Sequence, residues 1–240
     1  MKLEPLVVTA FASLGMVAAP ARACGVSASG VASCSLSEHL EELRSHWALG
    51  VSSLYTSTAL RFSGSLRAPE TRYAALAALA YLPTPRWVLQ AGMGATFGGA
   101  LRLPDGKHEF APGPAASVGA DYRFFDDGRW FALATSVLSF STAATRLSGS
   151  PVVHYEAFDV RIGAQFGLDI ADTLQPYAAA RVFGGPVFWH YAGEAVTGTD
   201  THHYQLGAGL GVRLSRHLNA YAEGIPLGER AVSFGVGMLL

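Results

Sequence analysis

The sequence has few charges and no long apolar run after its first 23 residues. Half of the 240 residues are hydrophobic, yet no later run approaches the roughly 18 to 20 apolar residues of a membrane-spanning helix. Apolar content without such runs indicates strands. Charged residues make up 15% of the chain, and the net charge of −1 gives no reason to expect nucleic acid as a partner.

Cysteine is nearly absent, with only Cys24 and Cys34 in the chain. Without a neighbouring histidine pair the two thiols make a poor metal or redox site, so we expect a disulfide in an oxidising compartment. Closing this short loop would restrict the unfolded chain by about 2 to 3 kcal/mol. None of the eight histidines forms a pair with helical metal-ligand spacing. We therefore expect no cofactor and no metal.

The N-terminus is typical of a secretory signal peptide. Lys2 precedes an apolar run over 6–17, and the small residues Ala21 and Ala23 are those that signal peptidase requires. We expect cleavage after Ala23, so that residues 1–23 are the signal. Cys24 directly after this site leaves lipidation as an alternative, although the preceding residues fit a lipobox poorly.

A short amphipathic helix is predicted after Cys34. Ser35 and Glu38 have the spacing of a capping box, and apolar residues recur at helical intervals. These apolar residues are Leu36, Leu40, Leu43 and Trp47. We assign residues 24–44 to an N-terminal segment on the periplasmic side, where the helix would lie at the mouth of a barrel.

Residues 45–240 alternate between bulky apolar and small or polar side chains, as strands with two unlike faces do. Turns after every second segment are short, and the connections between are longer. The pattern predicts an all-β fold, a ten-stranded antiparallel up-and-down transmembrane β-barrel with both ends at the periplasm, although a count of eight to twelve remains open. The ten segments are 46–56, 72–82, 86–97, 115–125, 130–140, 155–168, 175–187, 202–214, 218–225 and 230–240.

The last segment carries the most specific pattern. Bulky apolar residues share one face of a strand, while Ser233, Gly235 and Gly237 lie on the other. This resembles the closing strand of outer-membrane β-barrel proteins of Gram-negative bacteria, in which it serves as an insertion signal. The resemblance implies an outer-membrane location, insertion by the barrel-assembly machinery, and contact with outer-membrane lipid and lipopolysaccharide. The insertion-signal residues are Phe234, Val236, Met238 and Leu240.

The polar faces of the segments are expected to line the lumen. Acids and bases are mixed there, which favours a hydrogen-bonded network filling a narrow barrel over an ion-selective lining. We predict a monomer with a structural or narrow-pore role. The lumen network comprises Gln90, Asp121, Arg123, Asp159, Arg161, Gln165, Arg181, Gln205, Arg213 and Glu223.

Aromatic residues cluster at the ends of the predicted strands, where amphipathic rings suit the lipid headgroup level. An alternative use, as a sugar-binding platform, is open for residues 188–191 after the seventh segment. The aromatic residues at strand ends are Trp47, Tyr55, Tyr73, Tyr81, Trp87, Phe97, Tyr122, Phe124 and Tyr204.

Asp200 and His202 form the one pair with a catalytic look, because residues two apart in a strand share a face. Omptin proteases are similar in being ten-stranded barrels with an Asp-His pair at the outer rim. They also need a second pair of aspartates in an outer loop, and the sequence offers none there. We therefore expect no enzyme and no catalytic residue. An outer-membrane hydrolase using this pair, or a secreted soluble β-barrel binding an apolar ligand, remains the alternative.

Overall fold

The computed structural model describes residues 25–26, 32–33, 46–63, 66–147, 152–191 and 193–240 of the chain. The expected signal peptide, both cysteines and nearly all of the expected helix lie outside these residues. At the end of that helix, Trp47 instead begins a strand. No helix in the described part is long and apolar enough to cross a membrane.

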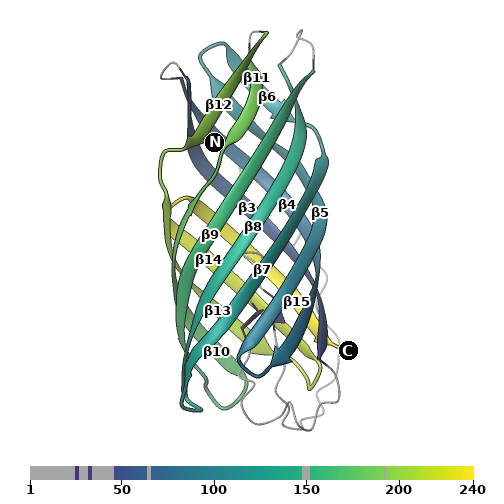
Figure 1. The fold of residues 1–240 in the computed structure, drawn as a ribbon, viewed down its shortest axis with the longest axis vertical. Helices are drawn as coiled ribbons and strands as arrows, with labels where there is room; N and C mark the ends of the chain where they lie inside the picture. The colour runs from purple at the N-terminus through teal and green to yellow at the C-terminus, as the bar shows by residue number, and fades with distance from the viewer. Residues whose placement is uncertain (1–24, 27–31, 34–45, 64–65, 148–151, 192) are drawn as a thin grey trace, which may run out of the picture.

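One antiparallel sheet closes on itself to form a barrel, as Figure 1 shows. A separate two-stranded sheet joins β1 (Gly25–Val26) to β2 (Ala32–Ser33). The strands of the barrel are β3 (Trp47–Phe62), β4 (Arg67–Thr84), β5 (Trp87–Leu103), β6 (Gly106–Phe110), β7 (Gly113–Asp126), β8 (Trp130–Arg146), β9 (Val153–Leu168), β10 (Leu174–Gly184), β11 (Val187–Tyr191), β12 (Glu194–Asp200), β13 (Tyr204–Arg213), β14 (Leu218–Gly228) and β15 (Arg230–Leu239).

Three long strands of the barrel are each interrupted, so that each consists of two labelled pieces. β7 continues β6 along β5, and β11 continues β10 along β9, each without a change of register. β12 leads into β13 with a shift of one residue, since Val187 pairs with Gly198 and Val182 pairs with Tyr204. With these pieces joined, ten strands ring the barrel, and the last strand closes against the first from Arg230↔Ser57 to Leu239↔Ala48. The ten-stranded antiparallel prediction is confirmed.

The ring narrows from ten strands to eight toward one end. The hairpin of β14 and β15 turns at Gly228–Arg230, and beyond this turn β12 pairs directly with β3, from Gly198↔Phe62 to Asp200↔Leu60. The ring there consists of β3, β4, β5, β6, β8, β9, β11 and β12. We call this part the outer section, and the ten-stranded part the membrane section.

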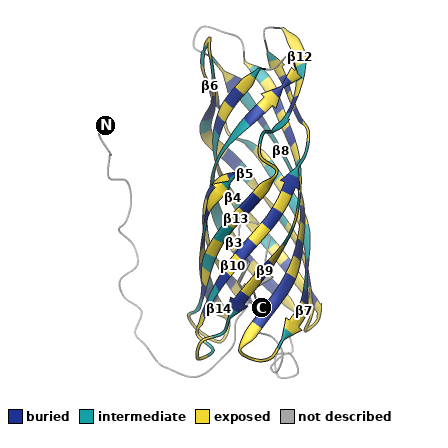
Figure 2. Cartoon of the chain, turned by 90° about the vertical axis from the view of Figure 1, so that its left-hand side faces the viewer, coloured by how far each residue is buried: buried dark blue, intermediate teal, exposed yellow. Residues whose placement is uncertain are grey.

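Two rings of aromatic residues mark the limits of the apolar wall on the membrane section. Trp47 packs on Tyr81 with ring centroids 4.7 Å apart, and Tyr55 packs on Tyr73 at 5.0 Å. Eight residues separate these levels along β3, which is about 27 Å of strand and about 20 Å of height at the usual tilt. Between them most outward side chains are apolar, with Met93 73% exposed and Ser53 and Ser136 among the few polar ones. Figure 2 shows exposed and buried residues alternating along each strand.

The polarity of the two faces reverses in the outer section. On β3, Leu49 and Val51 point outward in the membrane section, whereas the outward residue in the outer section is Arg61. The buried residues of β3 there are Leu60 and Phe62. The outer section therefore has an apolar interior and a polar outside, as a protein in water does, while the membrane section has the opposite arrangement.

The prediction of longer connections at the outer end of the barrel was wrong. β3, β4, β5 and β8 span 16 to 18 residues and run well past the expected strand ends. Residues expected in loops form the outer section, including the hairpin of β11 and β12. Tyr55 and Tyr73 consequently lie within their strands rather than at the ends. The reason is that the outer strands pair with one another in water and need no lipid to be stable.

Candidate functional site

The lumen of the membrane section holds pairs of buried polar side chains. Gln90 Nε2 donates to Asp121 Oδ2 at 3.3 Å. Nearer the turns, Arg123 Nη1 lies 2.6 Å from Asp126 Oδ2, and Arg213 donates to the carbonyl oxygen of Asp172. Apart from Asp172, which lies in the turn between β9 and β10, these residues come from β5, β7 and β13, and they pair locally.

Arg181 and Glu223 form the most completely buried ion pair among the described residues. Arg181 Nη1 and Nη2 donate to the two carboxylate oxygens of Glu223 at 2.9 and 2.7 Å. Tyr177 adds a hydroxyl hydrogen bond to Glu223 at 3.1 Å. A bidentate geometry of this kind satisfies the carboxylate as fully as a side chain can. The pair ties β10 to β14 along the inner wall, past the intervening β13.

A larger cluster lies where the barrel narrows, and its centre is Glu229 at the tip of the β14–β15 hairpin. Glu229 Oε2 lies 3.0 Å from Arg161 Nη2 in an ion pair and accepts a hydrogen bond from Gln205 Nε2 at 2.9 Å. Arg161 also pairs with Asp159. The hairpin is short, and its turn lies where the barrel narrows. It therefore places the carboxylate of Glu229 inside the barrel.

The opposite side of this cluster belongs to β4. Arg72 Nε lies 3.0 Å from Glu70 Oε1, and the hydroxyl of Tyr155 donates to Glu70 Oε2 at 3.0 Å. Arg72 also donates to Ser141 at 2.9 Å. A cavity of about 110 Å³ borders the cluster and is lined in part by Ser117, Ser139 and Ser141. At about 30 Å³ per water, this space suits a few water molecules.

An apolar cluster fills the outer section above these charges. Trp189 is 1% exposed and Tyr155 is fully buried. The rings of Phe62 and Trp189 lie 5.5 Å apart, and those of Phe110 and Tyr155 lie 4.9 Å apart. We call this cluster the apolar seal; it comprises Leu60, Phe62, Ala68, Leu101, Phe110, Ala143, Tyr155, Ala157, Val187 and Trp189.

All ten residues predicted for the lumen network lie on the inner wall, but in separate groups. Asp159, Arg161 and Gln205 belong to the Glu229 cluster. Gln165 is 1% exposed, and neither of its side-chain polar atoms has a partner among the described residues. The sequence reasoning missed Glu70, Arg72, Tyr155 and Glu229. Extending the alternation of β4 two residues back from Arg72 could have found Glu70.

The proposed face-sharing pair of Asp200 and His202 is wrong. β12 ends at Asp200 and β13 begins at Tyr204, so the strand alternation is interrupted between them. Asp200 Oδ1 accepts a hydrogen bond from Thr58 Oγ1 at 2.8 Å, whereas His202 is exposed, with Nδ1 3.1 Å from Thr201 Oγ1. No hydrogen bond or ion pair within the described residues joins the two.

The aromatic residues at 188–191 do not form an exposed platform either. They form strand β11, so consecutive side chains point to opposite faces. Trp189 is buried in the apolar seal, and Phe188 is 42% exposed on the outer wall. The alternation separates rings that a sugar-binding surface would need side by side.

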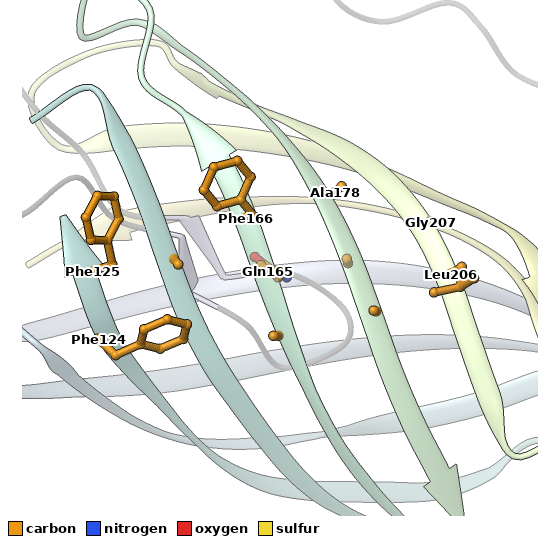
Figure 3. Close-up of a pocket in the computed structure, with 11 residues that line it drawn as sticks. Phe124, Phe125, Gln165, Phe166, Ala178, Leu206 and Gly207 are labelled. Atoms are coloured by element: carbon orange, nitrogen blue, oxygen red, sulfur yellow. The ribbon is translucent and has the colours of Figure 1, made fainter. Parts of the chain in front are cut away.

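A groove of about 820 Å³ lies on the outer wall of the membrane section, shown in Figure 3. Ala164, Ala178 and Ala180 form its floor, and Phe124 and Phe166 stand at one side. These side chains are exposed and belong to the apolar wall. The groove faces the hydrocarbon of the bilayer and is no pocket for a water-soluble substrate.

No protein-family model matches this sequence, and no curated protein matches it. Among solved structures, the outer-membrane protease OmpT from Escherichia coli is similar over 81% of this chain and 96% of its own, with 10% identity and a TM-score of 0.49. The beta domain of the Bordetella autotransporter BrkA is similar over 80% and 98%, with 18% identity and a TM-score of 0.46. The N-terminal barrel domain of OprF from Pseudomonas aeruginosa follows at 80% and 97%, with 14% identity and a TM-score of 0.37.

These TM-scores are below 0.5, so the likenesses carry no argument about function. The outer wall of the barrel shows that the protein spans a membrane. A closed barrel leaves no backbone edge unpaired in lipid, and an apolar band between two aromatic rings suits the bilayer core. The chain is an integral membrane barrel of the outer-membrane type.

Proposed function

We propose that this protein is an outer-membrane β-barrel whose lumen is closed, with a structural role in the membrane. The apolar seal is the observation that supports this role most directly. Its aromatic and aliphatic side chains fill the eight-stranded outer section, and the ion pairs of Arg181 and Arg161 fill the lumen beneath it. An ion crossing this path would have to shed water within an apolar constriction.

Single-channel recording in planar bilayers tests the closed lumen. The purified barrel, with its folding checked by heat-modifiable migration on a gel, should give no large steady conductance. A steady open level in most recordings of the wild-type protein would overturn the proposal.

A gated narrow pore is the second candidate, and the hairpin of β11 and β12 favours it. The hairpin is held by three residue pairs to β9 and three to β3. Both of its ends border breaks in the strands, at 185–186 and 201–203. Brief openings under applied voltage would support this candidate. A cysteine pair replacing Arg61 and Thr199, in a background of Cys24→Ser and Cys34→Ser, should abolish such openings on oxidation and restore them on reduction.

We further propose a role without enzymatic activity. The separation of Asp200 from His202 supports it, because a general base must lie within hydrogen-bond reach of its partner. Asp200→Ala and His202→Ala should leave any lipid or peptide hydrolysis in the preparation unchanged. Loss of a hydrolytic activity in either variant would contradict this proposal and support a hydrolase.

For the N-terminal segment we propose signal cleavage after Ala23 and a disulfide between Cys24 and Cys34. The pairing of Gly25 in β1 with Ser33 in β2 supports the disulfide, because these residues adjoin the two cysteines in the sequence. Mass spectrometry of the exported protein, with and without reductant, tests both points. We also propose insertion by the barrel-assembly machinery as a monomer.

A further inference from the structure

Basic residues face one another on the outside of the outer section. Arg61 on β3 is the direct cross-strand partner of Arg67 on β4. On the next hairpin, Arg102 on β5 is the direct partner of Lys107 on β6. All four side chains are exposed. Two like-charged pairs therefore stand on neighbouring strands of the same outer surface.

The structure supplies these pairs with little opposite charge. Lys107 Nζ lies 2.7 Å from Glu109 Oε1. No ion pair or side-chain hydrogen bond within the described residues involves Arg61, Arg67 or Arg102. Directly opposed like charges destabilise an antiparallel pair, since their Cβ atoms lie only about 5 Å apart. The repeated arrangement therefore suits an external anion that neutralises both members of a pair.

The height of the pairs on the barrel restricts which anion they meet. Arg61 follows Tyr55 by six residues on β3, and Arg67 precedes Tyr73 by six residues on β4. Tyr55 and Tyr73 belong to the ring of aromatic residues that lies nearer the outer section. Six residues correspond to about 20 Å of strand and about 15 Å of height. The pairs thus lie above the hydrocarbon, at the level of the polar part of the outer leaflet.

We propose that the surface formed by Arg61, Arg67, Arg102 and Lys107 binds phosphate groups of lipopolysaccharide in the outer leaflet. Guanidinium groups offer paired donors that match phosphate oxygens, and a phosphate between Arg61 and Arg67 accepts hydrogen bonds from both. The lipid is held beside β3 to β6, where its acyl chains lie along the apolar wall below. This inference is independent of whether the lumen conducts.

Binding of lipopolysaccharide to the purified full-length barrel in zwitterionic detergent, with chelator present, tests the proposal. The variant Arg61→Gln/Arg67→Gln removes one pair. Arg86→Gln/Arg216→Gln removes the same charge from exposed arginines in turns at the opposite end of the barrel. We expect the first variant to bind about tenfold more weakly, because it loses two charge-assisted contacts, and the second to bind as the wild type does.

Three further arms complete the experiment. Wild-type binding should weaken as salt is raised and should be lost with dephosphorylated lipopolysaccharide, and Arg102→Gln/Lys107→Gln should also weaken it. This last variant replaces the first if heat-modifiable migration shows that Arg61→Gln/Arg67→Gln does not fold. Unchanged affinity in the folded variants, or equal binding of the dephosphorylated lipid, overturns the proposal. Inorganic phosphate that binds as tightly as the lipid overturns lipopolysaccharide as the occupant.

Discussion

Trp189 donates its indole N–H to the hydroxyl of Thr145 at 2.8 Å, which ties the β11–β12 hairpin to β8 inside the apolar seal. The ring also packs against Phe62 of β3. One side chain therefore joins the hairpin to both sides of the outer section. If the seal closes the lumen, its integrity depends on this residue.

Replacing Trp189 by alanine should make the barrel leak. The change removes a large buried ring and leaves a cavity in the constriction, at a cost of about 3 to 5 kcal/mol in stability. We expect measurable small-ion conductance in bilayers from Trp189→Ala. The neighbouring Phe188→Ala, which changes the outer wall, should stay silent. Silence of a folded Trp189→Ala barrel would show that the seal lies elsewhere.

The Arg181–Glu223 pair should be costly to break on one side. Arg181→Met leaves Glu223 buried without its ion partner, so we expect a loss of about 3 to 5 kcal/mol in unfolding free energy. Removing both charges, with Arg181→Met/Glu223→Gln, should recover much of this loss. Urea unfolding in detergent or lipid measures both. The exposed pair of Lys107 and Glu109 is the control, and Lys107→Ala there should cost far less than Arg181→Met does.

Gly228 should resist substitution for steric reasons beyond its backbone angle. Its φ is +83°, and a Cβ there would lie 1.8 Å from the carbonyl oxygen of Tyr204. Gly128 has a φ of +85° but nothing within 4 Å of a Cβ. Gly128→Ala should cost about 1 to 2 kcal/mol, the price of a left-handed residue with a side chain. Gly228→Ala should cost clearly more, because the turn that carries Glu229 must move. Equal losses would contradict the close contact.

The position of the membrane predicts that an added charge costs much more stability at one outward site than at another. Met93 lies in the apolar wall, so Met93→Arg should destabilise the barrel by about 2 to 4 kcal/mol in lipid. His154, an exposed residue in the outer section, should accept arginine at little cost. Unfolding in lipid vesicles measures both variants. A small loss for Met93→Arg would move the bilayer away from this level.

The turn before β8 should lose stability only in acid. Backbone N–H groups of Trp130 and Arg129 donate to Asp127, and these hydrogen bonds lower the pKa of its carboxyl group. A lowered pKa means that the stabilisation is fully present above the usual aspartate pKa of about 4 and fades as the pH falls through the lowered value. The stability difference between wild type and Asp127→Ala should therefore be constant near neutral pH and shrink in acid. Equilibrium unfolding at a series of pH values tests this.

The assignment of residues to the two faces of a strand could be predicted from the sequence alone, because the strand period of two is a local property. Leu49 and Val51 outward, and Asp121 and Glu223 inward, follow from it. So does the closing of the final strand on the first. An even set of strands with short turns at one end leaves the barrel as the arrangement that pairs every edge.

The narrowing of the barrel and the contacts of its inner residues depend on the folded chain and could not be predicted from the sequence. The pairing of β12 with β3 depends on the β14–β15 hairpin stopping at Gly228, a relation between segments more than a hundred residues apart. The same relation brings Glu229 to Arg161 and places Asp200 opposite Leu60 of β3. Alternation also says nothing of height along the barrel, so the sequence pattern predicts loops where the polarity reverses beyond Tyr55. Partners across a lumen are fixed by register summed around the whole ring, and no local pattern records that sum.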